Sequence, residues 1–266
     1  TTTNRSRLEQ IIMCIFSRSV IDVSKTKIFA RKTGIYQYIA YQMDFQLYDE
    51  TAIILPIPCA LNTPEDGIEF IDFKKHDKFF MHLYELFEDS GERSRGVGSK
   101  SISLNMPLTI HVVGDFEASF VPTLADFDRV DERFKLQPEI WQQLPQYKDY
   151  GFVVFKLRKD ATTVHPMVFK FPSAMNGLYF PTLHIHDGQI HKLEKFDHIL
   201  YCQDGAGGAD IAVPGSWQFS KLDRNPYFRS NETCLGVLDR SNDSIFMRKV
   251  TGTQRNEDMV LYVYEK

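Results

Sequence analysis

The residues of this chain best suited to chemistry lie in one short stretch. Four of its eight histidines fall between positions 184 and 198, beside an aspartate: His184, His186, His191, His198 and Asp197. Imidazole and carboxylate side chains bind transition metals and transfer protons near neutral pH. This stretch is therefore the first candidate for a metal site or a proton-transfer site.

The spacing of these histidines fits a β-hairpin. Asp187-Gly188 favours a two-residue turn, because both central residues of a type I′ turn need positive φ. A turn at this point pairs His184 with His191 and places His186 on the same face, one pleat along. We expect three imidazoles on the open face and apolar residues on the face toward the core.

The lead hypothesis is a divalent-metal site on this hairpin. Directly opposed residues have Cβ atoms about 4.5–5.5 Å apart, so His184 and His191 can reach one ion, with His186 as a third ligand. Asp197 or His198 then serves as a fourth ligand or a general base, and the ion is Zn, Fe, Mn or Ni. Such a centre would suit a metal-dependent hydrolase or oxygenase. The alternative is a solvated polar strand face that binds nothing.

Two other functions stay open. One is a non-enzymatic structural or interaction protein, whose aromatic-rich sheet and polar loops form a surface for a partner. The other is a cysteine N-terminal-nucleophile hydrolase at Cys14, which requires cleavage after Met13 because the free α-amine is the base. A buried structural Cys14 is the competing interpretation.

Composition narrows the class of protein. The chain has 266 residues, a net charge of −4 and a pI near 6.1, so no basic field recruits nucleic acid or an anionic membrane. No apolar run is long enough for a transmembrane helix. Four widely spaced cysteines without a C-x-x-C motif favour buried free thiols in a cytoplasmic protein, and a mature secreted form stays open. We expect a protein partner or a homo-oligomer.

Hydrophobic patterns predict mostly strands, in agreement with 21 Phe and 12 Tyr. The expected strands are 13–20, 27–31, 39–47, 51–57, 108–113, 118–121, 152–157, 167–171, 179–186, 199–202, 234–238, 245–250 and 259–264. Helical spacing marks 77–87 and 124–134, and Pro138 begins a further short helix. The pattern favours a single α+β domain built on an extensive, largely antiparallel sheet with two helical clumps. We expect residues 1–12 to be frayed, 88–101 to form a mobile loop and 204–266 to form a C-terminal extension.

Several landmarks between positions 14 and 185 resemble a family of uncharacterised bacterial proteins. They are Ile54-Leu55-Pro56-Ile57-Pro58, Val113-Gly114-Asp115-Phe116 and Gly151-Phe152-Val153-Val154-Phe155-Lys156. The resemblance implies a shared fold but no activity, and the histidine stretch lies at or beyond its end.

Overall fold

The computed structural model describes residues 15–88, 110–114, 116–158, 164–185, 187–203, 215–231 and 233–262. Cys14 and His186 lie outside these ranges, as do the expected frayed segment and nearly all of the expected loop at 88–101. No helix in the described ranges is both long and apolar enough to cross a membrane.

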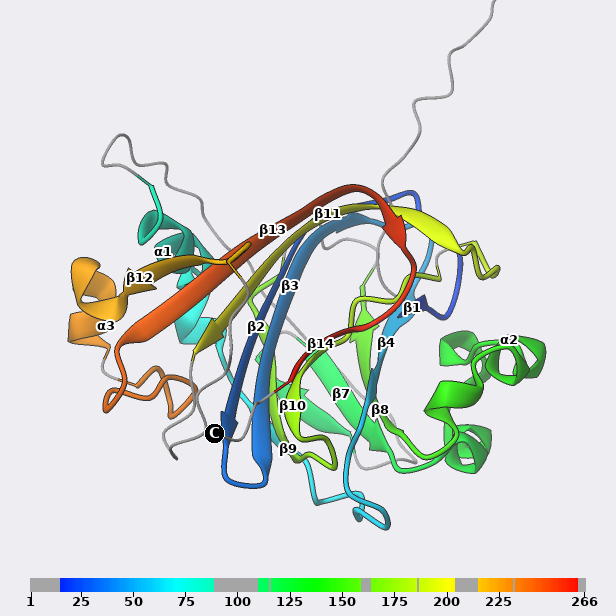
Figure 1. Ribbon diagram of the computed structural model, residues 1–266. Helices are drawn as coiled ribbons and strands as arrows, with labels where there is room; N and C mark the ends of the chain where they lie inside the picture. Colours follow the sequence, from blue (N-terminus) through cyan, green and yellow to red (C-terminus); the bar gives the residue numbers. More distant parts are fainter. Residues whose placement is uncertain are drawn as a thin grey trace, which may run out of the picture.

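The larger sheet of the described structure has seven strands in the order β12-β13-β11-β2-β3-β9-β5. Their bounds are β2 Asp22–Thr33, β3 Tyr36–Gln46, β5 Glu69–Ile71, β9 Met167–Pro172, β11 Leu193–Gln203, β12 Gln218–Lys221 and β13 Ser244–Arg255. All neighbours run antiparallel except β11 and β2, which are parallel. The long strands arch over the rest of the molecule (Figure 1).

The second sheet has five strands in the order β1-β4-β8-β7-β6, all antiparallel. Their bounds are β1 Ile15–Phe16, β4 Thr51–Ile57, β6 His111–Val113, β7 Phe116–Val121 and β8 Gly151–Leu157. A separate antiparallel pair, β10 Gly177–Phe180 and β14 Met259–Tyr262, lies beneath the arch (Figure 1). The prediction of a largely antiparallel, sheet-rich fold is confirmed.

Short helices cover the outer faces of both sheets. They are α1 Phe79–Glu85, α2 Pro138–Gln142 and α3 Pro226–Ser230, with 3-10 turns at Lys74–His76, Leu124–Arg129, Glu132–Phe134, Pro145–Tyr147 and Leu222–Arg224. Phe79, Phe80 and Phe228 pack on the larger sheet, whereas Phe127 and Ile140 pack on the smaller one. The main core fills the space between the two sheets.

This covering explains why β3 is more buried than its alternating sequence predicts. Ile39 and Tyr41 point into the core between the sheets, as expected for one face of a strand. Ala40, on the other face, is equally buried because it lies in the cluster under α1 and α3. Only the strand ends, such as Tyr36 and Gln46, are exposed.

Some expected elements are wrong or incomplete. Residues 124–134 form two 3-10 turns separated by an extended Val130, not one α-helix. The expected strand at 234–238 is a turn, with Cys234 and Leu235 at φ 46° and 57°. The expected strand at 179–186 ends at Phe180, and the sequence analysis missed β5, β12 and α3.

Gly151 tests how tightly the smaller sheet is packed. A Cβ added there would lie 2.5 Å from the Phe120 ring and 2.8 Å from the Cys59 Sγ atom. Gly151→Ala should lower the free energy of unfolding by about 1–3 kcal/mol, because overpacking displaces buried atoms. Urea denaturation measures this change. Gly215→Ala is the matched control, since no described atom lies within 4 Å of its added Cβ and its backbone is not left-handed. Equal effects of the two substitutions would contradict the packing described here.

Candidate functional site

The histidine stretch folds around one asparagine. The Asn256 side chain accepts a hydrogen bond from the His184 N–H at 2.7 Å and donates to the carbonyl oxygens of His184 and His191 at 2.9 and 3.0 Å. These bonds take the place of a strand ladder. The predicted hairpin with His184 opposite His191 is therefore wrong, and Ile185 instead bridges to Ile15.

His184 and His198 form a buried pair. Both are fully buried, and their Nε2 atoms lie 3.4 Å apart, so the N–H of one ring can donate to the nitrogen of the other. Phe196 packs against both rings. Burial lowers the pKa of His198 to about 3, which keeps this imidazole neutral at physiological pH.

The other predicted ligands lie in different surroundings. His191 is exposed, and its Nε2 atom lies 2.9 Å from Asp187 Oδ2. This hydrogen bond raises the pKa of His191. The expectation that the histidines share one open face is wrong, because His184 is in the core and His191 is at the surface.

Asp197 has a backbone partner in the neighbouring strand. Its Oδ2 atom accepts the Lys25 N–H at 2.7 Å, where β2 carries an irregularity between Ser24 and Lys27 and Lys25 has a φ of 54°. Burial raises the pKa of this carboxyl. Asp197 thus stabilises a bulge, which is a structural use of the residue predicted to be a general base.

The described residues contain no group of three or more His, Cys, Asp or Glu side chains placed to hold a metal ion. Two of the five predicted site residues, His184 and His198, are brought together. His186 lies outside the described ranges. The metal centre stays a prediction.

A second buried polar cluster, which the sequence analysis missed, is built on Asp258. Its carboxylate accepts hydrogen bonds from the Tyr147 and Tyr179 hydroxyls at 2.5 and 2.6 Å. The backbone N–H groups of Thr182 and Leu183 donate to its other oxygen at 2.8 and 3.0 Å. These donors join the start of β14 to β10 and to the turn before β8. The only sequence signal was a lone aspartate before an apolar strand.

Burial shifts the pKa values of the groups in the Asp258 cluster. Burial raises the pKa of Asp258, opposed by the four donated hydrogen bonds. Burial and the nearby Asp258 carboxyl also raise the pKa values of Tyr147 and Tyr179, so both phenols stay protonated and donate. Each carboxylate oxygen of Asp258 accepts two hydrogen bonds, which is typical of a structural carboxylate.

Among the exposed apolar residues of the described surface, three lie near the end of the β2–β3 hairpin. Ile35 and Tyr36 are 65% and 40% exposed, and Leu61 in the segment after β4 is 74% exposed. Ser173 N–H donates to the Ile35 carbonyl, and Ala60 N–H donates to the Pro172 carbonyl, both at 2.8 Å. Adjacent residues thus hold both segments at the same end of the molecule. We call Ile35, Tyr36 and Leu61 the apolar knob.

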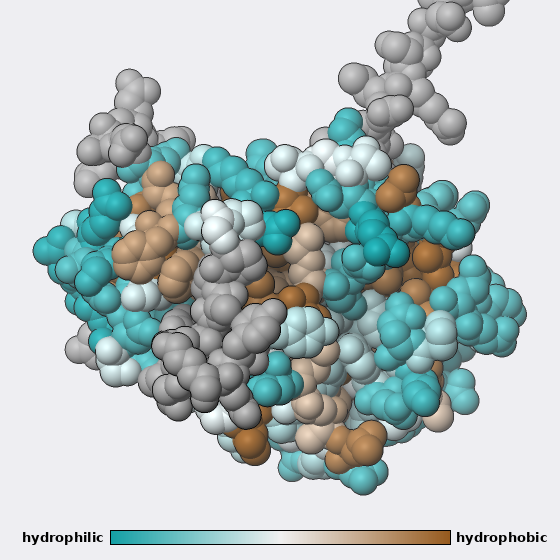
Figure 2. Space-filling view, viewed as in Figure 1, coloured by the Kyte–Doolittle hydropathy of each residue, from teal (hydrophilic) through white to brown (hydrophobic). Residues whose placement is uncertain are grey.

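The apolar knob is held rigidly. Gly34, at φ 55°, and Ile35 form the two-residue turn, because Thr33 pairs directly with Tyr36. Gln37 exchanges two hydrogen bonds with the Tyr179 backbone, at 2.7 and 3.1 Å. Hydrophobic side chains are visible along the lower edge of the molecule, where this hairpin ends (Figures 1 and 2).

The buried His198 predicts a specific pH dependence of stability. Its pKa is about 3 in the folded protein and about 6.5 in an unfolded chain. Because the unfolded chain binds the proton more readily, the stability that neutral His198 contributes is complete above pH 6.5 and is lost as the pH falls toward 3. Between pH 6.5 and pH 3, the free energy of unfolding of His198→Gln should fall less than that of the native protein, by on the order of a few kcal/mol. Urea denaturation at several pH values measures this difference. His191→Gln is the control, since that ring is exposed. If His198→Gln loses as much stability as the native protein over this pH range, the loss does not come from His198.

Asp258→Ala should be strongly destabilising. It leaves two buried hydroxyls and two N–H groups without their acceptor, and each costs about 1–3 kcal/mol when unsatisfied. We expect a loss of at least about 3 kcal/mol in the free energy of unfolding. Glu257→Ala, at the neighbouring and exposed side chain, should change stability by less than about 0.5 kcal/mol. Similar losses in both variants would refute the role of the Asp258 cluster.

Comparison with known proteins gives distant likenesses. No protein family model matches the chain, and no curated protein matches it. A crystal structure of baculovirus P35 matches 95% of this chain and 100% of its own, at 12% sequence identity and a TM-score of 0.48. A crystal structure of the caspase-8/P35 complex matches 91% of this chain and 97% of its own, at 11% identity and a TM-score of 0.47. The resemblance to uncharacterised bacterial proteins stays a prediction.

Proposed function

We propose that this protein acts by binding another protein through the apolar knob. The observation that carries the proposal is the exposure of Ile35, Tyr36 and Leu61 together at one end of the two sheets. Isolated exposed apolar residues are ordinary, but several that gather at one end of a molecule are typical of interaction sites.

The position of Ile35 supports this interpretation. Two-residue hairpin turns favour glycine, asparagine and aspartate, and a β-branched residue there gives no advantage to the turn. Ile35 is 65% exposed, so its side chain also adds little to the core. Burying it against a partner would contribute about 1.5–3 kcal/mol, and Leu61 a similar amount.

Rigidity strengthens the case. The Gln37–Tyr179 hydrogen bonds hold the hairpin against β10, and the Lys32 ammonium donates to the Met175 carbonyl. A knob fixed before binding loses little conformational entropy in a complex. The geometry therefore favours a preformed contact over a segment that folds on binding.

The shape of the apolar knob indicates the kind of partner. A two-fold dimer through this surface would have to pack one projection against another, because such an interface uses the same patch twice. A projection fits better into a recess. We therefore infer a different protein that offers an apolar recess about the size of a leucine or isoleucine side chain.

Site-specific photo-crosslinking tests the proposal. Ile35 is replaced by p-benzoylphenylalanine in the full chain, and the same probe at Leu193 is the control because Leu193 is also exposed but lies at the start of β11. We expect one discrete covalent adduct from position 35 and none from position 193. The adduct partner is then purified and titrated with the unlabelled protein.

The titration decides between specific and nonspecific capture. Leu61→Ser should weaken the purified pair at least about tenfold, whereas Leu193→Ser should leave it unchanged. Equal adducts from both positions, an adduct only with a second copy of this chain, or insensitivity to Leu61→Ser would each overturn the proposal.

A further inference from the structure

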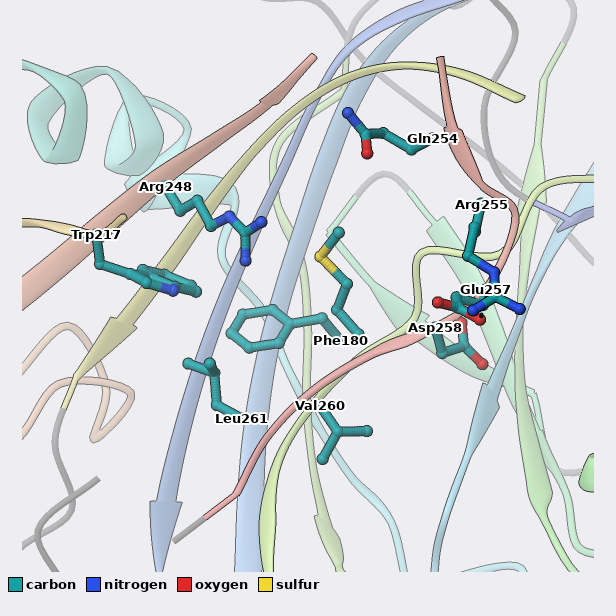
Figure 3. A pocket seen from close by; sticks show the side chains of 10 residues that line it. Phe180, Trp217, Arg248, Gln254, Arg255, Glu257, Asp258, Val260 and Leu261 are labelled. Atoms are coloured by element: carbon teal, nitrogen blue, oxygen red, sulfur yellow. Dashed lines mark ion pairs between the residues drawn. The ribbon is translucent and has the colours of Figure 1, made fainter. Parts of the chain in front are cut away.

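A cavity of about 310 Å³ lies beneath the arch of the larger sheet, away from the apolar knob. Its apolar wall comes from Phe180 on β10, Trp217 before β12, and Met259–Leu261 on β14. Arg248 and Gln254 from β13 complete it, with Arg255, Glu257 and Asp258 at the far end (Figure 3). Its volume is at the lower end of the range for small-molecule sites.

Two polar groups in the cavity are donors without an acceptor among the described residues. The Trp217 side chain is 92% buried, and its Nε1 atom has no hydrogen-bond partner there. Arg248 makes no ion pair or hydrogen bond with another described side chain, and its guanidinium points into the space beside Trp217 and Phe180 (Figure 3). Indole N–H and guanidinium groups can only donate.

The acidic groups of the cavity are already engaged. Asp258 accepts four hydrogen bonds, and Glu257 lies 3.9 Å from the Arg255 guanidinium. Among the described residues, the charge at the near end that has no ionic partner is therefore the positive charge of Arg248. A ligand that fits must bring an anionic acceptor to this end.

The neighbouring surfaces specify the rest of the ligand. Phe180 and Trp217 present rings whose centroids lie 6.0 Å apart, and Val260 and Leu261 add aliphatic surface. Flat apolar molecules pack well against such rings, and guanidinium groups bind carboxylates with charge-assisted hydrogen bonds. We propose that this cavity binds a small aromatic carboxylate, with its acid group on Arg248 and Trp217 Nε1 and its ring between Phe180 and Leu261.

Calorimetric titration of the full chain with 2-naphthoate and with its neutral analogue 2-naphthamide tests the proposal. We expect one site per chain for 2-naphthoate and at least about tenfold weaker binding of the amide, because hydrogen bonds to charged groups are worth more than neutral ones. Quenching of tryptophan fluorescence by 2-naphthoate should disappear in Trp217→Phe, which keeps an aromatic wall but removes the N–H donor.

Two variants separate the role of Arg248 from a general effect of charge. Arg248→Gln should weaken 2-naphthoate binding by about ten- to a hundredfold and leave the affinity for the amide nearly unchanged. Lys249→Gln is the matched control, since this exposed lysine lies next to Arg248 on β13 and donates to the Tyr84 hydroxyl outside the cavity, and it should bind 2-naphthoate like the native protein. Thermal unfolding shows that each variant is folded.

Three outcomes would overturn the proposal. They are no binding of 2-naphthoate up to its solubility limit, equal binding of acid and amide, and equal affinity in folded Arg248→Gln. Loss of binding in Arg255→Gln but not in Arg248→Gln would place the anion at the far end and also reject the assignment. None of these outcomes bears on the apolar knob, which lies on a separate surface.

Discussion

The Asp258 carboxylate is the interaction on which the arrangement of the two sheets depends. It receives hydrogen bonds from Tyr147, beside the smaller sheet, from Tyr179 on β10, and from the backbone at Thr182 and Leu183. An ionised group in a protein interior is unfavourable unless its acceptors are filled. The Asp258 carboxylate therefore fixes the positions of four donors, and it brings together segments that are distant in sequence.

That constraint also decides where the histidines lie. Leu183 is fixed by Asp258, and the next residue, His184, is held by Asn256 only two positions away from Asp258 along the chain. With its backbone held at both ends, the His184 ring turns inward to His198 and Phe196. The neutral state of His198 then follows from its burial beside these rings.

Sequence reasoning succeeded where a local pattern determines structure and failed where a distant residue does. Residues 51–57 form the expected strand, and the alternation at 39–47 correctly marks β3 as a strand, although both faces of β3 are buried in the structure. Asp187-Gly188 is a good turn signal, yet Asn256 supplies the hydrogen bonds that a hairpin ladder would have made. The donors to Asp258 are Tyr147, Tyr179 and the adjacent Thr182 and Leu183, all at least 75 positions before it, and nothing in a single sequence shows that they converge. The apolar run at 234–238 failed because Cys234 and Leu235 adopt left-handed φ values that periodicity does not reveal.

Tyr179 joins the interior network to the surface. Its hydroxyl donates to Asp258, and its backbone exchanges two hydrogen bonds with Gln37, next to Tyr36 of the apolar knob. A contiguous path of this kind does not by itself transmit a change, because transmission needs an element with two arrangements. What the path does supply is stiffness, because one residue, Tyr179, joins the end of the hairpin to the Asp258 carboxylate, which accepts four hydrogen bonds. A projection mounted in this way presents Ile35 in a fixed pose, and the entropy lost on binding is correspondingly small.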